Sequence, residues 1–486
     1  MADPPEKKVQ RTPDGDSIDR LSALSDCVLL HILSLLKTKE AAASSILSTR
    51  WRNLFVSLPD IDLCFCVDDD ASDRDRLFYQ FTHFSNRVIE QRNTAPIRKI
   101  RLRVEHFVER YRLAFESLLI SAAAAISTYS VDQLRISVEM DTTTEKFSIL
   151  FPPGIFSSET IVSLSLNLDV GWNVPDFVWL PNLKYLYLMR FTLSEESIEV
   201  EVLHISSPLL KVLVLCWNEK VELEFTVVVK SENLETLVCS LERQHKVIVD
   251  APNLKSLNVD GHVLEVHIIQ SLVSIDKAVV RAEFLHNVTN LGDLFFRVQH
   301  AFEFISGLQN VKSLNLSENI LKALYFSQPA LPTFRNLIKL ELEPVYCHSF
   351  PRSWILQVLS NLFESSPNLE VLIFSGVFKN YFGEDEKFGS VFPQAFPLSF
   401  IEHLKVIEMS NFNGEEHEFK LAEYFLKNGK SLKKIALERE GWKSVPEYCN
   451  RILSFKKCSE DCQIVFRKKW DYITCPQLRQ LMNLSP

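Results

Sequence analysis

The chain has 486 residues, of which 46% are hydrophobic and 24% are charged, and its formal net charge is −9. This is ordinary globular composition, and the length predicts about two to four domains or one long repeat array. The negative net charge gives no overall attraction to nucleic acid or to an anionic membrane. Residues 1–16 are polar, so we expect a disordered segment and no secretory signal, and no apolar run is long enough to predict a membrane span.

Residues 17–58 are the first predicted element, a compact helical unit. Asp26 is suited to cap a helix, and apolar residues then recur at helical spacing from Val28 to Leu36. A second short helix is predicted over 40–47 and a third around Trp51. About 40 residues hold too little core to fold securely alone. The surplus apolar surface therefore predicts a docking site for another protein.

This segment resembles the F-box of plant F-box proteins. The resemblance is carried by Leu24, Asp26, residues 28–34 (VLLHILS), Leu36, Thr38, Lys39, residues 46–48 (ILS), residues 50–52 (RWR) and Leu54. The chain departs from the family pattern at Ser25 and Lys37, where proline is usual.

The F-box resemblance implies docking onto the Skp-type adaptor of a cullin-RING (SCF) ubiquitin ligase. The contacts that it implies are Leu24, Val28, Ile32, Leu36, Leu47 and Trp51. The alternative is that these are internal core residues of an ordinary helical cap.

We expect residues 59–94 to be a hinge and linker ahead of a repeat body over 95–395. In that body one pattern recurs: an apolar residue, two others, Leu or Ile, one other, and a further apolar residue. Examples occupy 161–166, 183–188, 210–215, 311–316 and 337–342. From Leu164 to Leu257 the pattern advances in steps of 20 to 27 residues, which lie within the range of about 20–29 residues for leucine-rich repeats.

The repeated pattern predicts short parallel strands whose leucines point into a continuous core and whose intervening residues face outward. It resembles the degenerate leucine-rich repeats of plant F-box proteins, which implies a solenoid with strands on one face and helices or irregular turns on the other. We expect a target protein to bind the strand face, at Tyr185, Tyr187, Lys312, Asn315, Lys339 and Glu341. The alternatives are an ordinary α/β domain, and strand residues that are exposed without binding anything.

A helix is predicted over 111–127, and residues 396–475 are the last predicted domain. Its strand, turn, helix and second strand resemble the FBD domain that follows the repeats in plant F-box proteins. The resemblance is carried by residues 404–408, 412–414, 424–428 and 432–435. Such a unit would cap the open end of a solenoid. The predicted fold class is therefore α/β: a three-helix F-box-like unit, an irregular leucine-rich-repeat solenoid and an FBD-like cap.

No catalytic, nucleotide or metal motif is expected. The sequence GKS at 429–431 resembles the end of a P-loop, but Tyr424 stands where that motif needs glycine. No HExxH or GxSxG signature occurs. We therefore expect no enzyme activity and no cofactor.

The ten cysteines are expected to be reduced and buried, because no secretory signal precedes them. Cys64 and Cys66 alternate on a predicted strand, which is weak evidence for a metal site. Cys458 and Cys462 lack the paired CxxC spacing of zinc ligands. Buried thiols are thus favoured over metal ligands.

Together these expectations predict a substrate-recognition subunit of an SCF-type E3 ubiquitin ligase, in the cytoplasm or the nucleus. It would bind a Skp-type adaptor, through it a cullin-RING ligase, and a target protein, but no nucleic acid and no membrane. The alternative is a leucine-rich-repeat binding scaffold that takes no part in ubiquitination.

Overall fold

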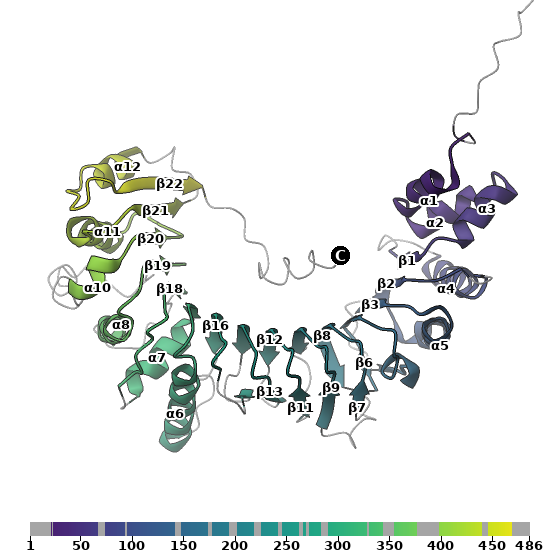
Figure 1. The fold of residues 1–486 in the computed structure, drawn as a ribbon, viewed down its shortest axis with the longest axis horizontal. Helices are drawn as coiled ribbons and strands as arrows, with labels where there is room; N and C mark the ends of the chain where they lie inside the picture. Colours follow the sequence, from purple (N-terminus) through teal and green to yellow (C-terminus); the bar gives the residue numbers. More distant parts are fainter. Residues whose placement is uncertain are drawn as a thin grey trace, which may run out of the picture.

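The computed structural model describes residues 21, 23–66, 73–92, 95–140, 147–173, 177–193, 202–217, 225–241, 245–261, 266–268, 272–282, 290–327, 330–343, 354–376, 398–439 and 446–468. The predicted helical unit is present near the N-terminus as α1 (Asp26–Ser34), α2 (Thr38–Ser44) and α3 (Thr49–Val56). Ser25 occupies the N-cap position of α1, and Asp26, which we expected there, is the first helical residue. This unit lies at one end of the molecule (Figure 1).

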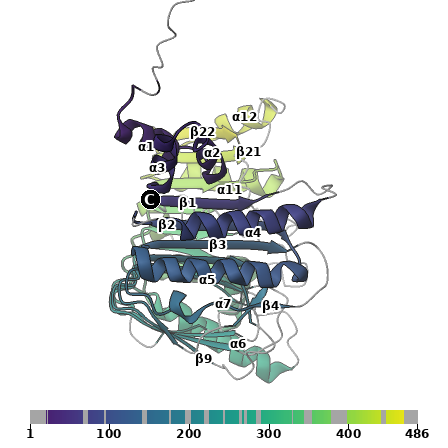
Figure 2. The ribbon, with the colours of Figure 1, turned by 90° about the vertical axis from the view of Figure 1, so that its right-hand side faces the viewer.

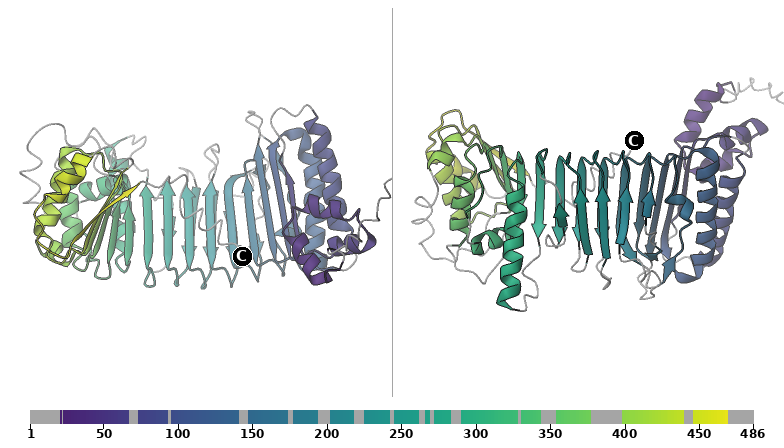
Figure 3. Two further views of the ribbon diagram at one scale, coloured as in Figure 1. Left: turned by 90° about the horizontal axis from the view of Figure 1, so that it is seen from above. Right: turned by 60° about the horizontal axis from the view of Figure 1, so that its bottom comes forward.

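The body of the molecule is a long parallel sheet, curved into an arc whose strands line the inner, concave side (Figure 1). Successive pairings join its strands in one continuous order. In that order the strands are β1 (Asp60–Phe65), β2 (Lys99–Phe107), β3 (Gln133–Met140), β5 (Ser163–Leu168), β8 (Tyr185–Leu193), β10 (Val212–Trp217), β12 (Thr236–Leu241), β14 (Ser256–Gly261), β16 (Lys277–Ala282), β17 (Ser313–Leu316), β18 (Lys339–Leu342), β19 (Val371–Phe374), β20 (Val406–Met409), β21 (Lys434–Arg439) and β22 (Gln463–Lys468). Short strands β4 (Ser148–Ile149) and β6 (Gly171–Trp172) add to it beside β8. Figure 3 shows these strands running side by side across the molecule.

The pattern leucines form the core between the concave sheet and the outer layer, as predicted. Leu164, Leu186, Leu213, Leu237 and Leu257 occupy equivalent places in successive strands, and each is at most 1% exposed. Side chains alternate between the two faces of a strand. On each strand the residues next to the buried leucine therefore face the concave side.

Asparagine side chains tie successive repeats together just before the strands. Asn182 Nδ2 donates to the Glu159 carbonyl at 2.6 Å, and Asn253 Nδ2 donates to the Glu232 carbonyl at 2.9 Å. Asn368 Nδ2 likewise donates to a carbonyl one repeat earlier. Asn233 and Asn336 form equivalent bonds. These bonds satisfy backbone acceptors that the sheet ladder leaves open, which explains why asparagine recurs just before the strands.

The convex side changes along the arc. Its outer helices are α4 (Arg74–Glu90) and α5 (Arg112–Tyr129) at the first end, and α6 (Leu291–Gly307), α7 (Glu318–Phe326), α8 (Trp354–Glu364), α10 (Leu398–His403), α11 (Glu416–Asn428) and α12 (Pro446–Leu453) toward the other. Short 3-10 helices cover Glu109–Tyr111 and Pro153–Ile155. In the middle a second parallel sheet replaces the helices, with strands β7 (Phe177–Trp179), β9 (Val202–Ser206), β11 (Phe225–Lys230), β13 (His245–Asp250) and β15 (Val266–Ile268). The helix predicted over 111–127 is α5.

The segment predicted as a hinge, 59–94, is instead the first repeat where it is described. Asp60–Phe65 forms β1, which pairs with β2 over six residues, and Arg74–Glu90 forms α4 beside α5. Figure 2 shows β1, β2 and β3 stacked behind α4 and α5. The apolar alternation of Ile61, Leu63 and Phe65, all buried, is the physical reason that this stretch joins the sheet.

The C-terminal unit continues the same sheet, because β20 pairs in parallel with β19 and β21 and β22 follow in order. The helix that we expected in this unit is α11. Glu418, which is buried, accepts backbone N–H bonds from Asn413, Gly414 and Glu415 at the start of α11. Gly414 has φ +88°, and a Cβ there would lie 2.1 Å from the Tyr448 ring, so this turn requires glycine.

Candidate functional site

The N-terminal helical unit has a small core of its own. Its buried side chains are Leu29, Leu33, Ala41, Trp51, Leu54 and Leu58. Arg50 holds α3 against α1 by donating to Asp26 Oδ1 at 2.6 Å and to the Leu24 carbonyl at 2.6 Å. Ser48 caps α3 by accepting the Trp51 N–H at 3.3 Å. The three helices therefore form one packed unit.

Five large apolar side chains on this unit remain exposed to solvent. Val28 and Leu36 are each 41% exposed, and Leu47 is 66% exposed. Leu35 and Ile46 are still more exposed, at 74% and 86%. Exposed apolar side chains gathered on so small a unit are typical of a protein-docking surface. We call Val28, Leu35, Leu36, Ile46 and Leu47 the apolar surface of the helical unit.

The six expected contacts do not all belong to this surface. Val28, Leu36 and Leu47 do, while Leu24 and Ile32 are half-buried and pack against the small core. Trp51 is only 6% exposed and packs inside the unit, so its contact with a partner stays a prediction. The expectation omitted Leu35 and Ile46, although both stand beside expected contacts in the sequence.

The helical unit is fixed to the first repeat by buried polar bonds. Thr38 Oγ1 accepts the N–H of Asp62 at 2.8 Å, which connects α2 to β1. Arg92 is 1% exposed and donates to the carbonyls of Val56 and Leu58, where α3 ends. Burial lowers the pKa of Arg92 to about 10, so it stays charged at neutral pH. These hydrogen bonds fix the position of the helical unit relative to the first repeat.

The concave residues expected to bind a target lie in two separate groups. Tyr185 and Tyr187 are on β8, where Tyr187 is in register with Ser165 of β5 and Val214 of β10. Lys312 immediately precedes β17, and the other expected residues are on β17 and β18. Five pairing steps separate β8 from β17, which amounts to roughly 24 Å at about 4.8 Å per strand. The structure does not bring the six residues into one site.

In the second group, on and next to β17 and β18, the charged residues form ion pairs with nearby side chains. Lys312 pairs with Asp276 at 2.7 Å, and Lys339 pairs with Glu341 at 3.5 Å. Asn315 is only 8% exposed.

A pocket of about 460 Å³ opens beside Lys312 at the starts of strands β17–β21, and its lining includes Arg335, Glu370, His403 and Lys405. Lys405 is paired with Glu370 at 2.5 Å.

A cluster of cations on β2 and β3 was not predicted. Lys99, Arg101 and Arg103 alternate along the concave face of β2, and Arg135 of β3 is directly in register with Arg101. Burial lowers the pKa of Arg135, and the neighbouring charge of Arg101 adds to this shift. Burial, followed by the charges of Arg101 and Arg135, lowers the pKa of Lys99. We call Lys99, Arg101, Arg103 and Arg135 the basic patch.

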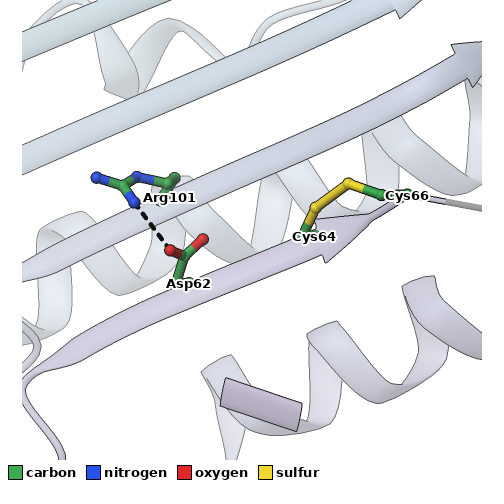
Figure 4. The surroundings of a disulfide bond; sticks show 4 residues. All are labelled: Asp62, Cys64, Cys66 and Arg101. Carbon is green, nitrogen blue, oxygen red and sulfur yellow. Dashed lines mark hydrogen bonds and ion pairs between the residues drawn. A yellow bond between two sulfur atoms is a disulfide. The ribbon is translucent and has the colours of Figure 1, made fainter. Parts of the chain in front are cut away.

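One carboxylate from β1 reaches the basic patch. Asp62 accepts a hydrogen bond from Arg101 at 2.9 Å, as Figure 4 shows. Lys99 and Arg103 form no ion pair with a residue that the structure describes. The alternation of cations over 99–103 was visible in the sequence, but the register that adds Arg135 was not.

The cysteines differ in part from the expectation of reduced, buried thiols. Cys64 and Cys66 form a disulfide at the end of β1 (Figure 4). Cys66 directly follows β1, and the Cα atoms of the two cysteines are 5.9 Å apart, within the range of about 4.4–6.8 Å for a disulfide. Cys27 and Cys458 are exposed, whereas Cys239 and Cys462 are buried as expected. Cys475 lies outside the described residues.

Within the described ranges no group of His, Cys, Asp and Glu side chains could hold a metal ion. No helix in the part of the chain that the structure describes is long and apolar enough to cross a membrane.

Comparison with known families agrees with the geometry at both ends of the chain. The family model of the F-box domain matches residues 21–62, which span the three helices and the start of β1. The FBD family model matches residues 393–437, which include β20 and α11. F-box domains in general bind Skp-type adaptors, and F-box proteins with leucine-rich repeats are typically adaptors of SCF-type ligases and not enzymes.

Relatives from Arabidopsis thaliana match over most of the chain. An F-box/LRR-repeat protein is 31% identical over 86% of this chain and 87% of its own length. An F-box/FBD/LRR-repeat protein is 28% identical over 92% of this chain and 96% of its own length. An FBD-associated F-box protein is 27% identical over 96% of this chain and 99% of its own length. The fold and these matches define a leucine-rich-repeat protein with an F-box and an FBD domain. The chain belongs to the plant F-box/FBD/LRR-repeat family.

Proposed function

We propose that this protein is the substrate-recognition subunit of an SCF-type E3 ubiquitin ligase in the cytoplasm or nucleus. Its F-box docks on a Skp-type adaptor and, through it, on a cullin-RING ligase, while the concave face of the repeats holds a target protein. The observation that carries this proposal is the apolar surface of the helical unit, on an F-box joined to the repeats by buried bonds. Val28, Leu36 and Leu47, three of the contacts that the F-box resemblance implies, lie on that surface.

The mechanism is positional. Because Thr38 and Arg92 fix the F-box against the first repeat, a target on the concave face is held at a defined position relative to the adaptor. Holding two reactants together raises their effective concentration, and ubiquitin transfer is accelerated without a catalytic residue on this chain.

A co-purification experiment tests the proposal. The tagged full-length chain is expressed in plant cells under proteasome inhibition, and the recovered proteins are compared with those of the Ile46→Asp/Leu47→Asp variant. We expect the intact chain to recover a Skp-type adaptor and a cullin, and the variant to lose both. Leu113→Asp is the matched control, because Leu113 is 73% exposed on α5, away from the F-box.

The competing function is a leucine-rich-repeat scaffold without a role in ubiquitination. It predicts that the intact, folded chain recovers partners of its concave face but no Skp-type adaptor. That result would reject the proposed function.

A further inference from the structure

The concave face carries a concentration of positive charge at the end next to the F-box. The chain as a whole has a net charge of −9, yet the basic patch places four cations on two adjacent strands. Asp62 pairs with Arg101, and Asp60, at the edge of the patch, pairs with Arg98 outside it at 2.9 Å. Glu105 and Glu139 follow on the same face, so the four cations of the patch outnumber the carboxylates of Asp62, Glu105 and Glu139 by one.

Repulsion between these cations destabilises the free protein. Like charges directly opposite on neighbouring strands destabilise a sheet, and Arg101 and Arg135 are directly opposite. Burial is the main cause of the lowered pKa values of Lys99 and Arg135, and the charge of Arg101 is the next cause for both. A ligand that brings negative charge onto these strands would relieve the repulsion.

The spacing of the cations along β2 indicates an extended ligand. Lys99, Arg101 and Arg103 repeat every second residue, which is about 6.6 Å along a strand. An extended peptide presents alternate side chains at the same interval. Glu105 and Glu139 follow on the same face of β2 and β3, and they limit the matching segment to about three acidic positions.

The neighbouring strands supply a surface that suits such a peptide. Beyond Arg135, β5 contributes Ser163 and Ser165, and β8 contributes Tyr185 and Tyr187 in the same rows. Tyrosine combines apolar area with a polar tip and is frequent at binding surfaces. Short side chains therefore lie between the cations and the tyrosines.

We propose that the basic patch binds an extended acidic segment of the target protein, with Asp or Glu at alternate positions i, i+2 and i+4, beside Tyr185 and Tyr187. Arg101 and Arg103 donate paired N–H groups to carboxylates, and Lys99 adds a further positive charge. This inference rests on the proposed function, since it identifies the chemistry of the segment that the concave face holds.

The test measures binding of two synthetic peptides to the purified full-length chain by fluorescence anisotropy. One peptide has Glu at three alternate positions separated by Ser, and the other has the same composition with the three Glu adjacent. We expect the alternating peptide to bind more tightly, and to bind more weakly as salt is raised from about 0.1 M to about 1 M. Equal affinity of the two peptides would overturn the extended geometry.

The variant Lys99→Gln/Arg103→Gln removes two cations and leaves the pair of Arg101 with Asp62 in place. We expect its affinity for the alternating peptide to fall about fivefold or more, with an unchanged or higher melting temperature because repulsion is reduced. The matched control is Lys211→Gln/Lys277→Gln, which removes the same charge near the starts of β10 and β16, outside the patch. An equal loss in both variants, or no loss in the first, would overturn the assignment.

A second pair of measurements separates the possible outcomes. The charge-reversed variant Lys99→Glu/Arg103→Glu should prefer a peptide with Lys in place of Glu, which keeps the test informative if the glutamine variant folds poorly. Tighter binding of a single-stranded oligonucleotide of equal charge would assign the patch to nucleic acid and overturn the peptide proposal. Adaptor co-purification is scored separately, so peptide binding without adaptor recovery rejects the proposed function alone.

Discussion

The guanidinium of Arg92 donates a hydrogen bond to the carbonyl of Leu58, from a side chain that is 1% exposed. Leu58 follows α3 of the F-box, and Arg92 follows α4 of the first repeat. The same guanidinium group also bonds to the Val56 carbonyl at 3.2 Å. One buried cation thus satisfies the open carbonyls at the end of an F-box helix and connects two units of different architecture.

Replacing Arg92 should loosen this junction. Arg92→Met removes charged donors from buried carbonyls, and we expect a loss of about 1–3 kcal/mol in the free energy of unfolding. Denaturant unfolding of the full chain measures the change. Arg52→Met is the control, since Arg52 is exposed on α3, and equal effects of the two substitutions would contradict the role given to Arg92.

Trp51→Ala should act through folding of the F-box. Truncation of this buried side chain costs about 3–5 kcal/mol, which is enough to unfold a unit with so small a core. We expect limited proteolysis to cut within residues 21–62 while the repeats stay intact, and adaptor binding to be lost with the fold. A protease-resistant F-box in this variant that nevertheless fails to bind would place Trp51 in the interface.

The two positions where the family has proline should respond differently to its introduction. Ser25 has φ −68° and Lys37 has φ −63°, and both values suit proline. Ser25→Pro should stabilise the F-box by about 0.4–1 kcal/mol and slow dissociation of the adaptor. Lys37→Pro should gain less, because it removes the N–H that Lys37 donates to Glu40 at 3.3 Å. Surface-based binding kinetics would show which of the two variants releases the adaptor more slowly. Slower release by Lys37→Pro than by Ser25→Pro would contradict this explanation.

His417 on α11 should make stability depend on pH. Burial lowers the pKa of His417 to about 4, below its ordinary value of about 6.5. Between these values the unfolded chain binds more protons than the folded chain, so the His417 contribution is lost as pH falls from about 6.5 to about 4. Melting temperatures across this range should fall less steeply for His417→Gln than for the unaltered chain. Parallel pH profiles would show that His417 does not titrate in this way.

The sequence predicted the F-box helices, the strand positions of the repeats and α11, because each depends on local periodicity of apolar residues. It misassigned β1 to a hinge, because the alternation of Ile61, Leu63 and Phe65 is too short to stand out without its partner strand. The second sheet on the convex side was also missed, since β9 and β11 carry no leucine motif. The basic patch depends on the register of Arg101 with Arg135, which only the fold sets.

The exposure of Trp51 and of Ile46 illustrates the same limit within the F-box. Both belong to the stretch that carries the resemblance, yet one is 6% and the other 86% exposed. Both are apolar in the sequence, but Trp51 lies on α3 and Ile46 lies in the turn between α2 and α3, and only packing of the three helices decides which of them remains available to a partner.

The most direct test of the account is the affinity of the purified full-length chain for a purified Skp-type adaptor, measured by calorimetry. We expect the unaltered chain to bind with a dissociation constant of about 1 μM or lower, equivalent to about −8.2 kcal/mol. The Ile46→Asp/Leu47→Asp variant should bind at least about a hundredfold more weakly, and Leu113→Asp should bind like the unaltered chain. Undiminished binding by the folded Ile46→Asp/Leu47→Asp variant would contradict the claim that this apolar surface docks the adaptor.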